Sequence, residues 1–368
     1  MNDKGISQYE GIALIALYIW GAVFITNVLA SNDMWFIIII SFVISIPLLI
    51  AYSRIMTNFK GEDLYTILEI VFGNGIGRIV TILYTLFFFS LGAIVLRNFI
   101  EYIRLTSLNR TPMIITGIVF EIIISYMVKQ GTESFGKCAA VFIIGLTVVA
   151  VFLGFFLILN GSEQASILLD FYKGFKSTII SVYSFISFPI GEVIVFMTIF
   201  NSLKSDVSIY KVFVGGMLFS IVIILINTIG INLMLMGKDH HDMFFPTFIA
   251  VRRIKVGEII QRVETLISIK LVIESFVEIS ACLFASCKGI SKIFNIKDYR
   301  SISTATSLLM AAVSIIVYEN TLYMAEWNAE IWPYYSFPFQ ILIPIIILLI
   351  SELKVRKKEN HEIERNKN

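Results

Sequence analysis

Charged residues are scarce in this chain, and their scarcity argues against a water-soluble fold. Only 15% of the 368 residues are Asp, Glu, Lys or Arg, whereas 57% are hydrophobic. Soluble globular proteins usually carry about 25% charged residues. We therefore expect a polytopic membrane protein whose apolar segments lie in lipid. The net charge of only +2 gives no reason to expect a nucleic-acid partner.

Cysteine and histidine are also rare, with three of each. Cys138, Cys282 and Cys287 have neither metal-ligand spacing nor an evident disulfide partner, which favours packing roles. The adjacent His240 and His241 cannot form the two-histidine face that an i,i+4 pair would present. The sequence also lacks a Ser-His-Asp set, a phosphate loop and a nucleotide fingerprint. We therefore expect no enzyme, no cofactor and no metal site.

Long apolar runs dominate the chain instead. About 20 apolar residues cross the hydrocarbon of a bilayer. On this basis the sequence predicts ten spans, at 11–30, 35–54, 79–100, 112–128, 138–160, 178–201, 211–236, 264–288, 302–318 and 334–352. Residues 1–352 would form one transmembrane domain, and the polar tail 353–368 is expected to be disordered.

The distribution of Lys and Arg predicts which ends face the cytoplasm. With the N-terminus inside, most of the basic residues fall on inside segments, and the connections 31–34 and 319–334 carry none. Positive residues mark cytoplasmic loops. Both termini are therefore expected to be cytoplasmic.

Two connections are expected to be structured. Residues 61–78 read as an amphipathic helix on the inner face, ended by a Gly-Asn-Gly turn. Residues 243–262 mix aromatic, apolar and basic residues around Pro246 and Gly257. They suggest a pair of short helices that could act as a lid over the outer mouth or as an interfacial anchor.

Two of the predicted spans contain helix-breaking residues. Gly21 lies within the first span, and Pro189 and Gly191 lie within the sixth. Two broken spans in corresponding halves point to a binding site near the membrane midplane. Five spans per half force the halves into opposite orientations. The expected fold is therefore an all-α membrane protein of LeuT type, a 5+5 inverted repeat with discontinuous helices 1 and 6.

Short motifs along nearly the whole chain carry a resemblance to a known family. They are Gly21-Ala22, Asn32-Asp33-Met34-Trp35, Gly73-Asn74-Gly75-Ile76-Gly77, Thr111-Pro112, Gly131, Phe188-Pro189-Ile190-Gly191-Glu192-Val193-Ile194 and Arg262-Val263-Glu264. In this order and spacing the chain resembles the spore germination permease family. These are the B subunits of GerA-type nutrient germinant receptors, a branch of the amino acid/polyamine/organocation superfamily.

The resemblance implies a receptor subunit in the spore inner membrane. It would bind a small germinant, with an amino acid favoured, and would work with a membrane-bound A subunit and a lipoprotein C subunit. A proton- or sodium-coupled amino acid transporter of the same fold is the alternative. A scaffold with a vestigial pocket is a third. Val23 stands where relatives often have a second glycine, so the ligand could differ from theirs.

The broken spans supply the first candidate ligand residues. At Gly21 and Ala22, a helix break would leave N–H groups free to bind a carboxylate. Pro189 and Gly191 would interrupt the sixth span. Glu192 follows them, and a carboxyl group at the midplane is costly unless it is protonated or paired. Glu192 could either bridge the unwound backbone of the first span or meet the ammonium group of a ligand.

The eighth span carries an ionisable stripe at i,i+4 spacing. Lys270, Glu274, Glu278 and Cys282 share one helix face. Lys270 and Glu274 could pair, which leaves Glu278 as a ligand contact or as part of a structural charge network. Cys282 extends the candidate site.

The third and fourth spans complete the set of candidates. Phe87 and Leu91, one turn apart, are expected to face the first and sixth spans. Arg97 and Glu101 are expected to pair at the surface. Glu121 lies in the fourth span, and the sequence gives no account of it.

Overall fold

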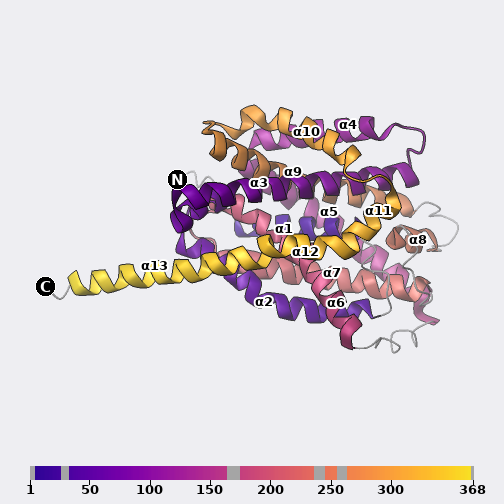
Figure 1. Cartoon of the computed structure of the whole chain (residues 1–368). Helices are drawn as coiled ribbons and strands as arrows, with labels where there is room; N and C mark the ends of the chain where they lie inside the picture. The colour runs from indigo at the N-terminus through magenta and orange to yellow at the C-terminus, as the bar shows by residue number, and fades with distance from the viewer. Residues whose placement is uncertain (1–4, 26–32, 164–174, 236–244, 255–262, 366–368) are drawn as a thin grey trace.

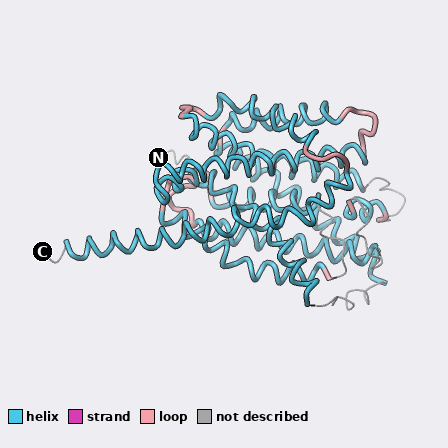
Figure 2. The backbone as a smooth tube through the Cα atoms, in the orientation of Figure 1, coloured by secondary structure: helices cyan, strands magenta, loops and turns pink. Residues whose placement is uncertain are grey.

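The computed structural model of the chain is a bundle of long helices. It describes residues 5–25, 33–163, 175–235, 245–254 and 263–365, with the backbone alone for 24–25, 175–177 and 355–365. Within these ranges the regular structure is helical, and Figure 2 shows loops mainly at the two ends of the bundle. Near one end Ile6 forms an isolated bridge with Leu203. We call this end, which carries the N-terminus in Figure 1, the N-terminal end of the bundle.

The first half of the chain forms five helices. They are α1 (Gln8–Ile25), α2 (Met34–Asn58), α3 (Leu64–Thr106), α4 (Met113–Gln130) and α5 (Thr132–Gly161).

The second half contains more interruptions. Its first segment is α6 (Phe175–Phe185), η3 (Ile186–Ile190), η4 (Gly191–Thr198) and η5 (Phe200–Ser202). There follow α7 (Ile209–Leu235), α8 (Pro246–Arg252), α9 (Glu264–Phe294), η6 (Tyr299–Ile302) and α10 (Ser303–Ile316). The last segment runs through α11 (Thr321–Glu326), η7 (Trp327–Ile331), α12 (Trp332–Phe337), η8 (Pro338–Leu342) and α13 (Ile343–Arg365).

The helices confirm an integral, multi-pass membrane protein. Eight described helical segments are long and apolar enough to cross a bilayer. Of the other two predicted spans, α1 is apolar but shorter, and α9 has the length but carries buried charges. Each predicted span thus falls on a helix, although the count of ten remains a prediction.

Helices at equivalent positions in the two halves pack against each other. The second predicted span, α2, contacts the seventh, α7; α3 contacts the eighth, α9; and α4 contacts the ninth, α10. Likewise α1, the first predicted span, contacts η3 and η4 of the sixth predicted span. This pairing is expected when two five-helix halves are related by a two-fold axis.

The predicted break in the sixth span is confirmed. The prediction of a break in the first span is wrong for this conformation. Phe188 leaves helical geometry at φ −145° and ψ 109°, and the Phe188–Pro189 peptide is cis. By contrast, α1 runs unbroken through Gly21 to Ile25. Because glycine has no side chain, it also serves close helix–helix contact, and Gly21 is used in that way here.

The structured connections are confirmed in part. Gly73, at φ 78° and ψ 171°, separates an N-terminal helical stretch of α3 from its spanning portion, as the Gly-Asn-Gly turn predicted. The short helix α8 is present, while residues 255–262 of the predicted second helix lie outside the described residues. The tail is not disordered up to Arg365, because α13 continues as one helix beyond the bundle (Figure 1).

Candidate functional site

The break in the sixth span leaves backbone carbonyls that two other spans satisfy. Ser187 O accepts hydrogen bonds from Gln340 Nε2 at 2.9 Å and from Trp332 Nε1 at 3.4 Å. On the other side of the break, Gly191 O accepts one from Tyr52 Oη at 3.5 Å. In a bilayer these carbonyls need such partners, because water is absent. The sequence analysis missed all three side chains.

Tyr52 and Gln340 are also joined to each other. Tyr52 Oη donates to the backbone carbonyl of Gln340 at 2.5 Å, and Gly191 packs so tightly on the Gln340 side chain that any larger residue would collide with it. The break is therefore held by α2 and η8.

Gly21 provides close contact between α1 and α9. A Cβ atom added to Gly21 would lie 2.8 Å from Glu278 Oε2 and 3.1 Å from both the carbonyl carbon and oxygen of Glu274. A glycine at this position brings the α1 backbone against the polar face of α9. Gly21 thus lies beside Glu278, although it does not break its helix.

The predicted polar stripe of α9 is buried along its whole length. Lys270 Nζ pairs with Glu274 Oε1 at 2.6 Å, which confirms the expected intrahelical pair, and it lies 5.3 Å from the ring centre of Trp20. Glu274 and Glu278 are both fully buried. Among the described residues, no hydrogen-bond partner reaches either oxygen of Glu278.

A second buried carboxyl group comes from the broken sixth span. Glu192 lies in η4 with 0% exposure, and its two oxygens also lack a hydrogen-bond partner among the described residues. Glu192 and Glu278 lie on elements that pack together, η4 and α9, and they interact electrostatically. Tyr18 Oη lies 3.9 Å from Cys282 Sγ and interacts electrostatically with both carboxyl groups. We call Glu192 and Glu278 the carboxyl pair.

The nine candidate ligand residues do not all gather in one cluster. All nine are buried: Gly21, Ala22, Phe87, Leu91, Pro189, Gly191, Glu192, Glu278 and Cys282. Gly21 and Cys282 adjoin the carboxyl pair from α1 and α9. Pro189 lies in the break, and Gly191 packs on Gln340. Leu91 and Ala22 are buried in α3 and α1, beside these elements.

Phe87 faces a different direction from the one expected. Its ring stacks on Phe339 at 4.5 Å and on Trp332 at 5.7 Å, so it faces the last span rather than the first and sixth. Trp332 in turn meets the ring of Phe188 at 6.2 Å. Trp332 thus lies between the rings of Phe87 and Phe188 and links Phe87 to the break.

The carboxyl pair is closed off from the surface in this conformation. Both side chains have 0% exposure, and pockets of about 590, 380 and 40 Å³ among the described residues are not lined by a candidate ligand residue. The smallest lies between Trp20, Lys270 and Thr247, under α8. A cavity of 40 Å³ holds about one water molecule. Ligand access to the pair therefore requires the helices to move.

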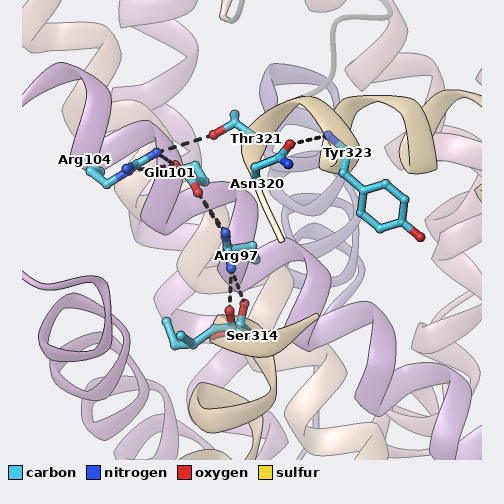
Figure 3. Close-up of polar contacts among 8 residues, drawn as sticks. Arg97, Glu101, Arg104, Ser314, Asn320, Thr321 and Tyr323 are labelled. Carbon is cyan, nitrogen blue, oxygen red and sulfur yellow. Dashed lines mark hydrogen bonds and ion pairs between the residues drawn. The ribbon is translucent and has the colours of Figure 1, made fainter. Parts of the chain in front are cut away.

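Arg97 and Glu101 form a buried network rather than the expected surface pair. The Arg97 guanidinium lies 3.0 Å from Glu101 Oε1, and both side chains are almost fully buried. Arg97 Nη1 also donates to the carbonyls of Ser314 and Ile315 at 3.3 and 2.7 Å. Figure 3 shows how this network joins the last turns of α3 to the end of α10 at Ser314 and to the start of α11 at Thr321.

Glu121 is a buried carboxyl group between α4 and α10. Ser307 Oγ donates to Glu121 Oε2 at 2.8 Å and lies 2.9 Å from the Glu121 carbonyl oxygen. Glu121 Oε1 has no hydrogen-bond partner among the described residues. Glu121 thus joins two helices outside the cluster of candidate ligand residues.

Comparison with solved structures defines the class of protein. The chain superposes on Mhp1, a nucleobase-cation-symport-1 family transporter, with a TM-score of 0.66 over 94% of this chain and 78% of Mhp1, at 12% identity. It also matches a manganese transporter from Eremococcus coleocola at a TM-score of 0.65, over 94% of this chain and 85% of that one, at 11% identity. The fold is that of the LeuT-type transporters.

Sequence comparison then gives the family. The spore germination protein family matches residues 5–326, so this chain belongs to that family. Spore germination protein KB of Bacillus subtilis (strain 168) is 23% identical over 92% of both chains. The putative spore germination protein YfkT of the same organism is 24% identical over 95% of this chain and 96% of its own. The predicted family is confirmed.

Proposed function

We propose that this chain is the B subunit of a nutrient germinant receptor, which binds a small germinant at the carboxyl pair and thereby triggers germination. The observation that supports this most is the pair itself: Glu192 and Glu278, fully buried and without hydrogen-bond partners among the described residues. Uncompensated buried carboxyl groups are costly in a membrane and are retained mainly for function.

The chemistry of the pair favours a ligand with an ammonium group, and an amino acid has one. Two carboxyl groups close together can accept hydrogen bonds from one cation and share its charge. The small cavity between Trp20 and Lys270 lies beside the Lys270–Glu274 pair, and Lys270 would receive a ligand carboxylate there once the cavity widens in an open conformation. Pro189, Gly191 and Ala22 would form the surrounding backbone wall, with Leu91 and Cys282 as apolar contacts.

Binding would act by shifting a conformational equilibrium. The described conformation buries the pair, so a ligand that binds only an open conformation would populate that conformation. In this proposal both termini are cytoplasmic, the N-terminal end of the bundle faces the cytoplasm of the spore inner membrane, and α8 lies at the outer end. The signal would pass to A and C subunits.

The decisive experiment measures germination of spores whose receptor carries Glu278→Gln. Loss of a charge-assisted hydrogen bond costs about 1.5–3 kcal/mol, which corresponds to roughly 10- to 100-fold in ligand concentration. We expect the nutrient dose–response to shift by that factor at a normal receptor level, measured by immunoblot. Glu133→Gln, a partly exposed carboxyl on α5, is the matched control. An unchanged dose–response at normal receptor level would exclude this site.

A transporter remains the alternative function. The structural neighbours described as transporters favour it, because their fold supports alternating access. Glu192 and Glu278 would then carry the coupling proton or bind the coupling ion. Uptake of radiolabelled amino acids into proteoliposomes, with and without a proton gradient, tests this alternative. Gradient-driven flux that Glu192→Gln abolishes would favour transport, and the absence of flux would favour the receptor.

A further inference from the structure

A polar pocket of about 590 Å³ opens at the N-terminal end of the bundle, apart from the carboxyl pair. It lies where the start of α3, the start of α5 and the end of η5 meet the end of α9, the connection after it and η6. Ser202, in its wall, is joined to Ile6 by a 2.8 Å backbone hydrogen bond, which places the pocket at this end. Ligand pockets are typically about 300–1,000 Å³, so the volume suits a small molecule.

The wall of this pocket is positively charged. Lys288, Lys292 and Lys297 line it, with Asp63 as the only lining carboxylate. Asp63 already accepts a 2.9 Å hydrogen bond from the backbone N–H of Thr66, where it caps α3. Lys292 is paired with Glu69 at 2.8 Å. The remaining lysines, Lys288 and Lys297, carry the excess charge.

Lys288 is a half-buried ammonium group whose hydrogen-bond acceptors among the described residues are neutral. Its Nζ donates to the carbonyl oxygen of Thr198 at 2.5 Å and to Asn201 Oδ1 at 3.2 Å. Among the described residues, no ion pair is found for Lys288 or for Lys297. A charge that is partly removed from water and has no counter-ion favours binding of an anion.

Ser291 provides a second, independent indication that the pocket binds a ligand. It lies one turn from Lys288 on α9 and lines the same pocket, and its buried Oγ has no hydrogen-bond partner among the described residues. A hydroxyl that is unsatisfied in this way can donate to an oxyanion. Within the described part of the chain, the pocket thus offers two ammonium groups without an ion-pair partner, against the single carboxylate of Asp63, and an unsatisfied hydroxyl.

We propose that this pocket binds a phosphate group or a similar multivalent oxyanion. Lys288 forms the floor of the site, Lys297 supplies a second charge at its rim, and Ser291 donates a hydrogen bond. The phosphate group belongs either to a soluble anion or to the headgroup of an anionic lipid. Both would meet the same three side chains.

Occupancy of the pocket is coupled to the end of the broken sixth span. Lys288 holds Thr198, the last residue of η4, and Asn201 of η5. An anion draws the same ammonium group toward itself, so it competes with these two contacts. Any movement of η4 that frees Lys288 strengthens anion binding, and the coupling is reciprocal.

The test is a binding measurement on the full chain in phosphatidylcholine nanodiscs. Pyrophosphate is titrated calorimetrically at constant ionic strength, with chloride as the reference anion. We expect saturable binding that Lys288→Gln and Lys297→Gln each weaken about tenfold or more. Lys137→Gln, an exposed lysine at the same end and outside the pocket, is the matched control and should bind as the wild type does.

Lys297 keeps the test interpretable, because its side chain is exposed and its loss should leave the fold intact. The absence of saturable binding, or equal affinities in Lys297→Gln and Lys137→Gln, would overturn the proposal. Nanodiscs that contain phosphatidylglycerol distinguish the two sources. If the headgroup occupies the site, pyrophosphate affinity falls in the wild type; if a soluble anion does, it is unchanged. The measurement is independent of any germinant and therefore of the proposed receptor function.

Discussion

Gly21 and Glu278 are in contact across the interface of α1 and α9, where a Cβ on Gly21 would lie 2.8 Å from Glu278 Oε2. The carboxylate could rotate away from a new methyl group. The Glu274 backbone, 3.1 Å from the same position, could not move without displacing α9. The glycine therefore sets how closely α1 approaches the polar stripe.

Gly21→Ala is accordingly expected to push the two helices apart and to destabilise the protein. Overpacking of this kind costs about 1–3 kcal/mol, against a gain of about 1 kcal/mol in helix propensity. The thermal midpoint in detergent should fall. Gly215→Ala on α7 is the control, because its nearest neighbour would lie 3.6 Å away and only the propensity gain should remain. Equal midpoints for the two variants would contradict the close contact.

Tyr52→Phe tests how the helix break is held. The substitution removes the hydroxyl that donates to Gln340 O and Gly191 O and leaves the ring in place. A buried carbonyl that loses its partner costs about 1–3 kcal/mol. We expect a lower thermal midpoint than in the wild type. The same change at the exposed Tyr126 removes a hydroxyl that faces the surroundings, and it should have no effect.

The buried ion pair of Arg97 and Glu101 should matter far more than an exposed pair with the same spacing. Glu101→Gln leaves the Arg97 and Arg104 guanidinium groups without their carboxylate. Breaking a buried pair from one side costs about 3–5 kcal/mol. Glu133→Gln breaks the exposed i,i+4 pair with Lys137 on α5 and should leave the midpoint unchanged. Similar losses in both variants would show that burial is not the cause.

The sequence predicted features that depend on local spacing. The i,i+4 stripe from Lys270 to Cys282 follows from helix geometry, and the break at Pro189 follows from the missing N–H of proline. Gly21 was misjudged because a glycine that breaks a helix and a glycine that admits a neighbouring helix look the same in one sequence. Only packing against α9 distinguishes them.

Long-range partners could not be read from the sequence. Tyr52 and Gln340 lie on opposite sides of the break in the chain, and neither has a local motif that would mark it as a partner. Phe87 was misplaced for the same reason, since a run of phenylalanines does not indicate which neighbour each ring meets. The pocket that contains Lys288 combines residues from several segments far apart in the chain, so no single stretch of sequence reveals it.

Glu192→Gln should separate stability from function at the carboxyl pair. Glu192 and Glu278 are neighbouring buried carboxyl groups without hydrogen-bond partners among the described residues. A glutamine amide could donate to Glu278, so the variant should have a higher thermal midpoint than the wild type. Its spores should nevertheless respond more weakly to nutrient, because the cation-binding charge is reduced. Residues kept for function often cost stability in this way. A lower midpoint with an unchanged nutrient response would instead assign Glu192 a structural role.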